Sequence, residues 1–342
     1  MACPDRPASP HALHRGATIP ASAAAPRVDP VRVDVRSLTK SFGAVRAVAD
    51  LSFSVEAGSV TGFLGPNGAG KTTTLRMLLG LERPDAGTAT FDDRPYADLA
   101  APVRTVGAVL ETAFHPARSG RNHLRVYCRA AGLPVSRADE TLAQVGLADA
   151  ANRRAGGYSL GMRQRLALAT ALLGDPSVLV LDEPANGLDP EGIHWLRGFL
   201  RYLAHDEGRT VLVSSHLLSE MEQTADRVVI VGAGRLVREG SIDELRSGAA
   251  GAGSVLVRSP EADRLLAALR HGGLTVTAGD GGLLTVAHST PAEVGTRAFA
   301  AGVELHELRA QTSGLEDLYF QLTAGQEQYA ATDTTTRPEA AR

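Results

Sequence analysis

Apolar and polar residues alternate along the first part of the chain. The apolar members of the pattern are Val31, Val33, Val35, Leu51, Phe53 and Val55. Because successive side chains of a strand point to opposite faces, this period of two predicts half-buried strands over residues 32–64. The short apolar run 59–64 is the last of these strands and leads directly into a glycine-rich loop.

Further along, helical periods alternate with short, continuous apolar runs. Residues 178–181 and 210–214 are almost wholly apolar, as expected of parallel strands that are buried on both faces. Strands that alternate with helices predict a parallel α/β sheet. The predicted helices span 72–81, 122–150 with a break at 132–134, 159–173 and 193–204.

A second, smaller pattern follows the Gly- and Ala-rich stretch 247–254, which predicts a linker. Its order of elements resembles a split βαβ unit. Strands are expected at 254–258, 274–277, 283–287 and 303–308, and helices at 261–270, 291–300 and 315–322. The sequence therefore predicts a main domain over 31–246, a small α+β domain over 254–322, and disordered termini at 1–30 and 323–342.

The composition disfavours nucleic-acid-binding, disulfide-rich and membrane-spanning proteins. The net charge of −3 offers no field for a phosphate backbone, so a nucleic-acid partner is not expected. Two cysteines cannot build a disulfide framework, which fits a reducing cytoplasm. No run reaches the about 18 apolar residues of a membrane span, and residues 1–30 lack the apolar core of a signal peptide. A membrane role would need a partner.

Residues 65–72 match the pattern G-x-x-x-x-G-K-[ST] between a predicted strand and a predicted helix. Such a loop turns its backbone N–H groups towards phosphates, and the helix N-terminus adds positive potential. Lys71 is expected to reach the β- and γ-phosphates of ATP, and the Thr72 hydroxyl to ligate Mg²⁺. A chance match is disfavoured by the strand–loop–helix context. The predicted ATP-binding residues of this segment are Gly65, Pro66, Asn67, Gly68, Ala69, Gly70, Lys71, Thr72 and Thr73.

Two acidic residues follow the buried run 178–181. A strand that ends in Asp182 places a carboxylate beside the Mg²⁺ that bridges the phosphates. Glu183, one position further, is placed to polarise a water molecule in line with the γ-phosphate. Without the upstream loop, two ordinary surface acids would be an equal alternative.

With these motifs, residues 31–245 resemble the ATP-binding subunits of ABC transporters. In that family a Leu-Ser-Gly-Gly-Gln turn caps a helix that faces the γ-phosphate of ATP held by a second subunit. Ser159 and Gly161 agree with the family, whereas Leu160 and Met162 depart from it. The retained hydroxyl and the helix-terminal N–H groups are the parts that bind phosphate. Tyr158 stands at the first position of the turn.

The resemblance implies a fold and further site residues. The fold is an α/β phosphate-loop NTPase with an ABC-type core, in which a parallel sheet joins antiparallel β and helical subdomains, followed by the α+β appendix. Asp189 in 186–189 resembles the family's D-loop, and His216 matches its switch histidine, although a lone histidine is often structural. Phe42 stands where the adenine-stacking aromatic is found; the alternative is a core residue at a strand end.

Glu111 stands where the family usually has a Gln that ligates Mg²⁺. A carboxylate is also a magnesium ligand, and the alternative is a solvated loop acid. Together with 186–192 and 315–320, Glu111 resembles the subgroup that exports drugs and peptide antibiotics of the daunorubicin or bacitracin type. The aromatic loop 112–116 is expected, with the helices that follow, to dock a membrane subunit. The basic residues Arg153, Arg154, Arg163 and Arg165 are interpreted as a solvated helix face.

The resemblance implies an ATPase that binds two ATP molecules, with Mg²⁺, between two copies of itself. Glu183 and His216 are the catalytic candidates, and Ser159 to Met162 of the opposing copy close each site. A separate transmembrane permease is the expected partner, through which the ATPase powers export of a drug- or antibiotic-like substrate. This partner places the chain in the cytoplasm at the inner face of the membrane. The alternatives are a soluble ABC ATPase acting on ribosomes or DNA, disfavoured by the single core, and an unrelated phosphate-loop kinase.

Overall fold

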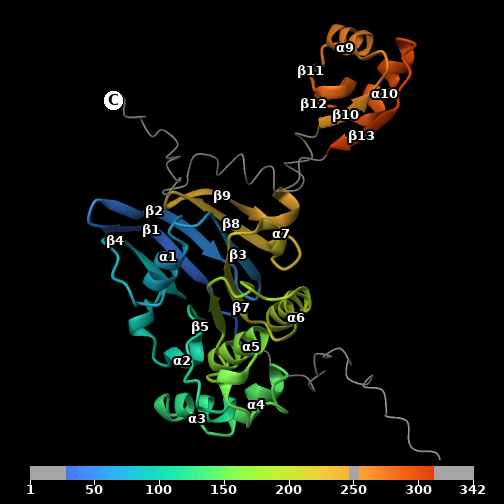
Figure 1. Ribbon diagram of the computed structural model, residues 1–342. Helices are drawn as coiled ribbons and strands as arrows, with labels where there is room; N and C mark the ends of the chain where they lie inside the picture. The colour runs from blue at the N-terminus through green and yellow to red at the C-terminus, as the bar shows by residue number, and fades with distance from the viewer. Residues whose placement is uncertain (1–27, 246–253, 312–342) are drawn as a thin grey trace, which may run out of the picture.

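The computed structural model describes residues 28–245 and 254–311 (Figure 1). The first of these ranges is built on a six-stranded sheet in the order β5-β6-β7-β3-β8-β9. Neighbouring strands are parallel except β9, which pairs antiparallel with β8. In chain order the strands are β3 (Val60–Leu64), β5 (Val106–Val109), β6 (Val178–Leu181), β7 (Thr210–Ser215), β8 (Arg227–Gly232) and β9 (Arg235–Ser241). The predicted parallel sheet is confirmed.

A second, three-stranded antiparallel sheet carries the alternating pattern of the N-terminal strands. It has the order β2-β1-β4, with β1 at Val33–Phe42, β2 at Val45–Val55 and β4 at Ala86–Phe91. Its apolar residues share one core with β3, where the rings of Phe53 and Phe63 stack at a centroid distance of 5.1 Å. Burial of these side chains against the larger sheet fixes the position of the loop that follows β3.

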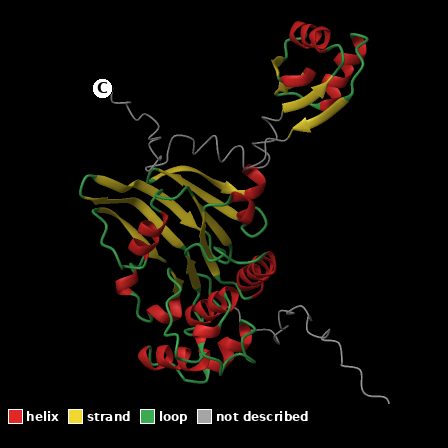
Figure 2. Cartoon of the chain, viewed as in Figure 1, coloured by secondary structure: helices red, strands yellow, loops and turns green. Residues whose placement is uncertain are grey.

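Helices surround the larger sheet and form a unit of their own at one end (Figures 1 and 2). There α3, α4 and α5 pack around a core that includes Leu124, Leu142 and Leu166, each at most 1% exposed. The predicted break at residues 132–134 separates α3 from α4. The helices are α1 (Lys71–Leu78), α2 (Pro102–Thr105), α3 (Gly120–Ala130), α4 (Arg137–Gln144), α5 (Leu160–Ala171), α6 (Pro190–Arg201) and α7 (Leu218–Met221).

Residues 254–311 form an α+β unit with its own core. Its antiparallel sheet has the order β11-β12-β10-β13. Since β12 lies between β10 and β11 and is antiparallel to both, β10-α9-β11 is a split βαβ unit, as the sequence predicts. The elements are β10 (Ser254–Arg258), α9 (Ala262–His271), β11 (Thr275–Ala278), β12 (Leu283–Ala287), α10 (Pro291–Ala300) and β13 (Glu307–Gln311).

One strand of this unit lies elsewhere than predicted. The expected strand 303–308 is found at Glu307–Gln311, because Val303 is a core residue of the turn after α10, at 7% exposure. Pairing with β10 begins only at Glu307, opposite Arg258. The predicted linker at 247–254 lies outside the described residues except for Ser254, which begins β10. The predicted helix at 315–322 and both predicted disordered termini, apart from residues 28–30, also lie outside them. The domain boundaries stay a prediction.

Candidate functional site

The glycine-rich loop joins the buried end of β3 to α1, which begins at Lys71. β3 lies between β7 and β8, so the loop emerges at the carboxyl end of the parallel strands. Gly70 has a φ of 92°, and a Cβ there would lie 2.3 Å from the backbone oxygen of Ala47. Only glycine fits this close approach, which lets the loop close tightly against β2.

Lys71 is the buried cation of the site, with 6% of its side chain exposed. Its Nζ donates hydrogen bonds to the carbonyl oxygens of Gly65 (2.7 Å) and Pro66 (3.3 Å). The same Nζ lies 3.3 Å from Glu183 Oε1. A buried ammonium is tolerated because hydrogen bonds and a counterion replace its lost hydration. The lysine is therefore held at the mouth of the loop, where a phosphate would lie.

Asp182 sits in a hydroxyl-rich network at the end of β6. The Thr72 hydroxyl donates to Asp182 Oδ2 at 2.6 Å, and the Ser214 hydroxyl donates to Oδ1. Ser214 Oγ in turn accepts the backbone N–H of Glu183 at 2.9 Å. Sequence reasoning missed Ser214; the available signal was a hydroxyl residue that ends an otherwise apolar strand. Ser214 fixes both carboxylate-bearing residues relative to β7.

The Glu183 carboxylate lies between two nitrogen groups. His216 Nδ1 is 2.7 Å from Glu183 Oε2, while Lys71 approaches the other oxygen. Glu183 has a φ of +47°, a conformation that costs roughly 1 kcal/mol or more for a residue with a Cβ. The surrounding contacts therefore hold a carboxylate in a position that its own backbone disfavours.

Phe42 lies at the solvent-exposed edge of the same region. It is 48% exposed, so the alternative of a core phenylalanine is excluded. It shares a hollow of about 360 Å³ with the glycine-rich loop. The hollow is lined by Phe42, Val45, Ala47, Gly68, Gly70, Lys71, Thr72 and Thr73. An aromatic face next to a phosphate-binding loop fits a nucleoside triphosphate, because a base stacks on the ring while phosphates meet the N–H groups.

A second hollow is formed by the segments around Ser159 and Asp189, and it shares no lining residue with the first. Each segment caps a helix. Ser159 Oγ accepts the Met162 N–H at 3.3 Å at the start of α5, and Asp189 Oδ1 accepts the Gly192 N–H at 2.8 Å at the start of α6. One copy of the chain therefore does not bring Ser159 and Lys71 into one pocket.

Glu111 is placed apart from the Asp182 network. Its side chain is 75% exposed, and Oε1 lies 3.1 Å from Nη2 of Arg76 on α1. Glu111 follows β5, whose last residue, Val109, accepts the Asp182 N–H. Glu111 thus lies at the carboxyl edge of the parallel strands, as Asp182 does. Its role as a magnesium ligand stays a prediction.

The interpretation of the basic cluster as a solvated helix face is wrong for two of its members. Arg163 donates to the carbonyl oxygen of Tyr158 (3.1 Å), and its guanidinium lies 5.2 Å from the centroid of the Phe114 ring. Arg165 stacks over Trp195 at 4.0 Å, and burial lowers its pKa. Aromatic faces attract the planar guanidinium, which α5 directs towards the protein.

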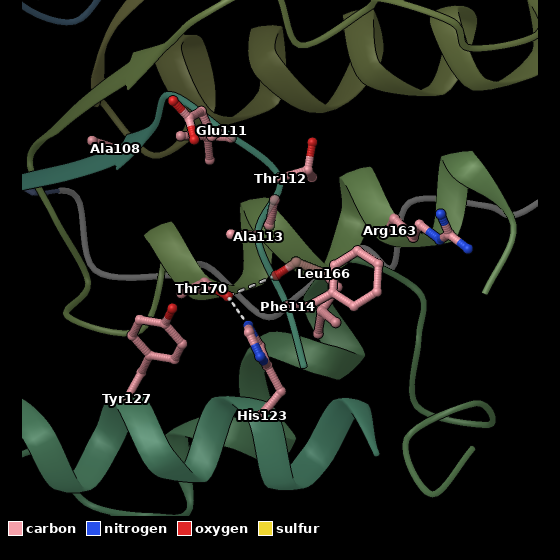
Figure 3. A pocket seen from close by; sticks show the side chains of 12 residues that line it. Ala108, Glu111, Thr112, Ala113, Phe114, His123, Tyr127, Arg163, Leu166 and Thr170 are labelled. Carbon is pink, nitrogen blue, oxygen red and sulfur yellow. Dashed lines mark hydrogen bonds between the residues drawn. The ribbon is translucent and has the colours of Figure 1, made fainter. Parts of the chain in front are cut away.

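Phe114 lines a third hollow, of about 150 Å³, between the segment after β5 and helices α3 and α5 (Figure 3). Figure 3 shows His123 and Tyr127 rising from α3 towards Thr170, with Phe114 beside Arg163. Phe114 is only partly buried and packs on the edge of the main core. The predicted docking loop therefore borders a real concavity.

His123 lies at the base of this hollow, and we expect it to make the stability of the fold depend on pH. It is 4% exposed, and its Nδ1 has no hydrogen-bond partner among the described residues. Burial, and then the charge of Arg118, lower the pKa of His123. His123 therefore binds a proton near pH 6.5 in the unfolded chain, but only at a lower pH in the folded chain. We expect stability to fall as the pH is lowered below about 6.5, with a slope of at most about 1.4 kcal/mol per pH unit from this group.

The measurement is the melting temperature at pH 7.5 and 5.5. The variant His123→Gln should lose less stability between these values than the wild type, whereas exposed His194→Gln should behave as the wild type. Equal losses in the wild type and His123→Gln would contradict this account.

The similarities to known proteins agree with the motifs described above. Residues 48–186 match the family model described as ABC transporter, and residues 253–316 match a domain of unknown function (DUF8746). The chain is 41% identical over 217 residues to the bacitracin transport ATP-binding protein BcrA of Bacillus licheniformis, which covers 63% of this chain and 71% of the relative. It is 36% identical over 301 residues to the Nod factor export ATP-binding protein I of Burkholderia lata, which covers 85% and 96%.

Among solved structures, an ATP-binding subunit of an ABC transporter matches with a TM-score of 0.56 and 28% identity, over 63% of this chain and 92% of that one. The loop, the carboxylates and the parallel sheet define a phosphate-loop ATPase. Within that class the chain belongs to the ATP-binding proteins of ABC transporters. The predicted family, fold class and ATPase activity are confirmed. None of the described helices is long and apolar enough to cross a membrane.

Proposed function

We propose that the protein is the motor subunit of an exporter and binds two ATP molecules between two copies of itself. The observation that carries the proposal is that the predicted ATP-site residues are divided between two separate hollows. Lys71, Asp182 and Glu183 are joined in one network, while the caps at Ser159 and Asp189 face a separate hollow. Two copies placed head to tail complete both sites at once. ATP then favours the closed pair, since only that state offers both halves of each site.

The roles of the side chains follow from their contacts. Lys71 neutralises the terminal phosphates, and the N–H groups of the loop and of α1 bind their oxygens. Glu183 accepts a proton from the attacking water, and His216, hydrogen-bonded to Glu183 Oε2, holds that carboxylate in place. The hydroxyl groups of Thr72 and Ser214, which donate to Asp182, hold its carboxylate in a fixed orientation. Closing by the second copy excludes bulk water from the site and leaves the one attacking water beside Glu183.

Magnesium fits the donor set beside the loop. Thr72 Oγ1 and Asp182 Oδ2 are 2.6 Å apart, and hydroxyl and carboxylate oxygens are ligands that Mg²⁺ prefers. Thr72 and Asp182 are the residues that would hold the ion, with Glu111 as a further candidate once Arg76 releases it. The bound ion supplies neutralisation of charge on the phosphates.

Export is supported by the relatives. Two relatives are named for bacitracin transport and Nod factor export. From the first of them we assign a drug- or antibiotic-like substrate, which a separate permease carries across the membrane. The ATPase would lie at the cytoplasmic face and contact the membrane only through the permease. A soluble ATPase acting on ribosomes or DNA is the weaker candidate, because no described feature favours a nucleic acid.

The permease is expected to dock in the hollow beside Phe114. Phe114→Ala should lower recruitment to membranes that contain the permease at least ~10-fold, as expected when one buried aromatic anchor of an interface is removed. ATP hydrolysis by the isolated subunit should stay unchanged. The measurement is cosedimentation with membranes, together with the ATPase rate with and without permease.

The matched control is Phe299→Ala, since Phe299 is 88% exposed on α10, outside this hollow. Equal recruitment of Phe114→Ala and Phe299→Ala would exclude the hollow as the docking site. Transport itself is tested with inverted vesicles, where ATP-dependent uptake of a bacitracin-like peptide should require both subunits.

A further inference from the structure

Leu160 and Gly187 form a contact between the start of α5 and the loop before α6. Leu160 Cδ2 lies 2.7 Å from the point where a Cβ on Gly187 would stand, which is closer than any carbon–carbon contact allows. Gly187 also has a φ of +73°. The backbone conformation at position 187 therefore favours glycine, and the space beside Gly187 is occupied by the end of the Leu160 side chain.

The contact extends along both segments. A Cβ on Gly161 would lie 3.9 Å from Leu188 Cδ2, and a Cβ on Gly192 would lie 3.3 Å from Leu188 Cβ. One turn further, Arg165 of α5 stacks on Trp195 of α6. Residues 186–189 thus lie beside the first turns of two helices, and the glycine of each segment contacts a leucine side chain of the other.

Burial alone does not account for a leucine at position 160. Leu160 remains 47% exposed, so it gains only part of the transfer free energy that a buried leucine contributes. Its defining property is shape, because its side chain fills the space beside Gly187. A glycine at position 160, as in the family's usual turn, would leave that space empty and the loop without this support.

We propose that Leu160 is a positioning residue that fixes segment 186–189 to the first turn of α5, so that the two move as one body. This inference rests on the proposed two-copy arrangement, in which Ser159 and Asp189 both face the other copy. When the start of α5 closes on ATP held by the partner, Leu160 carries Asp189 with it. Closure of that site therefore sets the position of segment 186–189, whose Asn186 donates its N–H to the carbonyl oxygen of Glu183 (3.2 Å).

The test is a double-mutant cycle with Gly187→Ala, Leu160→Ala and the variant that carries both. A methyl group at position 187 and the Leu160 side chain cannot both occupy this space, so Gly187→Ala should break the contact between them and lower kcat for ATP hydrolysis at least ~10-fold. The dissociation constant for ATP should not change, because the two hollows share no lining residue. Adding Leu160→Ala should bring kcat to within ~3-fold of Leu160→Ala alone.

Gly132→Ala is the matched control for backbone strain. Gly132 has a φ of +66°, and nothing lies within 4 Å of its Cβ position, so this variant carries the cost of positive φ without a clash. If Gly187→Ala is no worse than Gly132→Ala, or if the two losses in kcat simply multiply in the double variant, the positioning role is refuted.

Amide hydrogen exchange of residues 186–189 separates this inference from the proposed function. Exchange should be faster in Gly187→Ala and return towards the Leu160→Ala rate in the double variant. If that pattern appears in a protein that does not form ATP-dependent dimers, the contact stands and the two-copy proposal falls. If dimers form and exchange shows no such coupling, the positioning role falls alone.

Discussion

Glu183→Gln should bind ATP and accumulate as a dimer that hydrolyses it ~10²- to 10³-fold more slowly, the loss typical of a missing general base. The amide keeps the size of the side chain and removes the negative charge that accepts a proton from water. It also weakens the contact with Lys71, which is 3.3 Å away in the wild type. The measurements are steady-state phosphate release and light scattering after gel filtration with ATP.

Glu239→Gln is the control, because this exposed acid on β9 changes the net charge equally and lies far outside the lining of either hollow. It should hydrolyse ATP at the wild-type rate. Normal turnover by Glu183→Gln would remove Glu183 from the role of base, and a trapped monomer would contradict the two-copy arrangement.

Lys71→Arg should weaken ATP binding ~100-fold or more, since a site that loses a charge-assisted contact to phosphate and gains a clash forfeits about 3 kcal/mol. Lys71 is 6% exposed and its ammonium fits between two carbonyl oxygens and Glu183. A guanidinium is planar and larger, so it does not enter that space without displacing the loop. The dissociation constant is measured with a fluorescent ATP analogue.

The chain supplies its own control, because Lys40 is the only other lysine. Lys40 forms ion pairs with Glu82 and Asp85, and its Nζ lies 5.2 Å from the centroid of the Phe42 ring. A guanidinium can keep both ion pairs and the contact with the ring. Lys40→Arg should therefore bind ATP as the wild type does. Similar affinities for Lys71→Arg and the wild type would show that the lysine is not in contact with phosphate.

Local chemistry explains what could be predicted from the sequence. A glycine-rich loop is recognisable because its backbone needs glycine at fixed positions, such as Gly70 against Ala47. The apolar run that ends in Asp182 is recognisable because a strand buried on both faces admits no polar residue. The sheet, the break between α3 and α4, and the split βαβ order all follow from such periodic or steric requirements.

Contacts between segments that are distant in the sequence could not be predicted from it. Ser214 and Asp182 meet only because β7 and β6 are neighbours, and nothing local to either residue indicates it. The sequence predicts Arg163 to be a solvated surface charge, because only the folded structure brings Phe114 next to its guanidinium. The short strand β4, with Ala, Gly and Thr in five of its six positions, has too little apolar alternation to be recognised.

The pairing of Lys71 with Glu183 has a consequence for the protein between turnovers. Glu183 is the counterion of the buried Lys71 ammonium, which requires one. A terminal phosphate brings negative charge to the same ammonium, so nucleotide and carboxylate compete for one cation. We therefore expect nucleotide affinity to reflect the difference between two ion pairs, and release of the product to be eased as Glu183 pairs with Lys71 again.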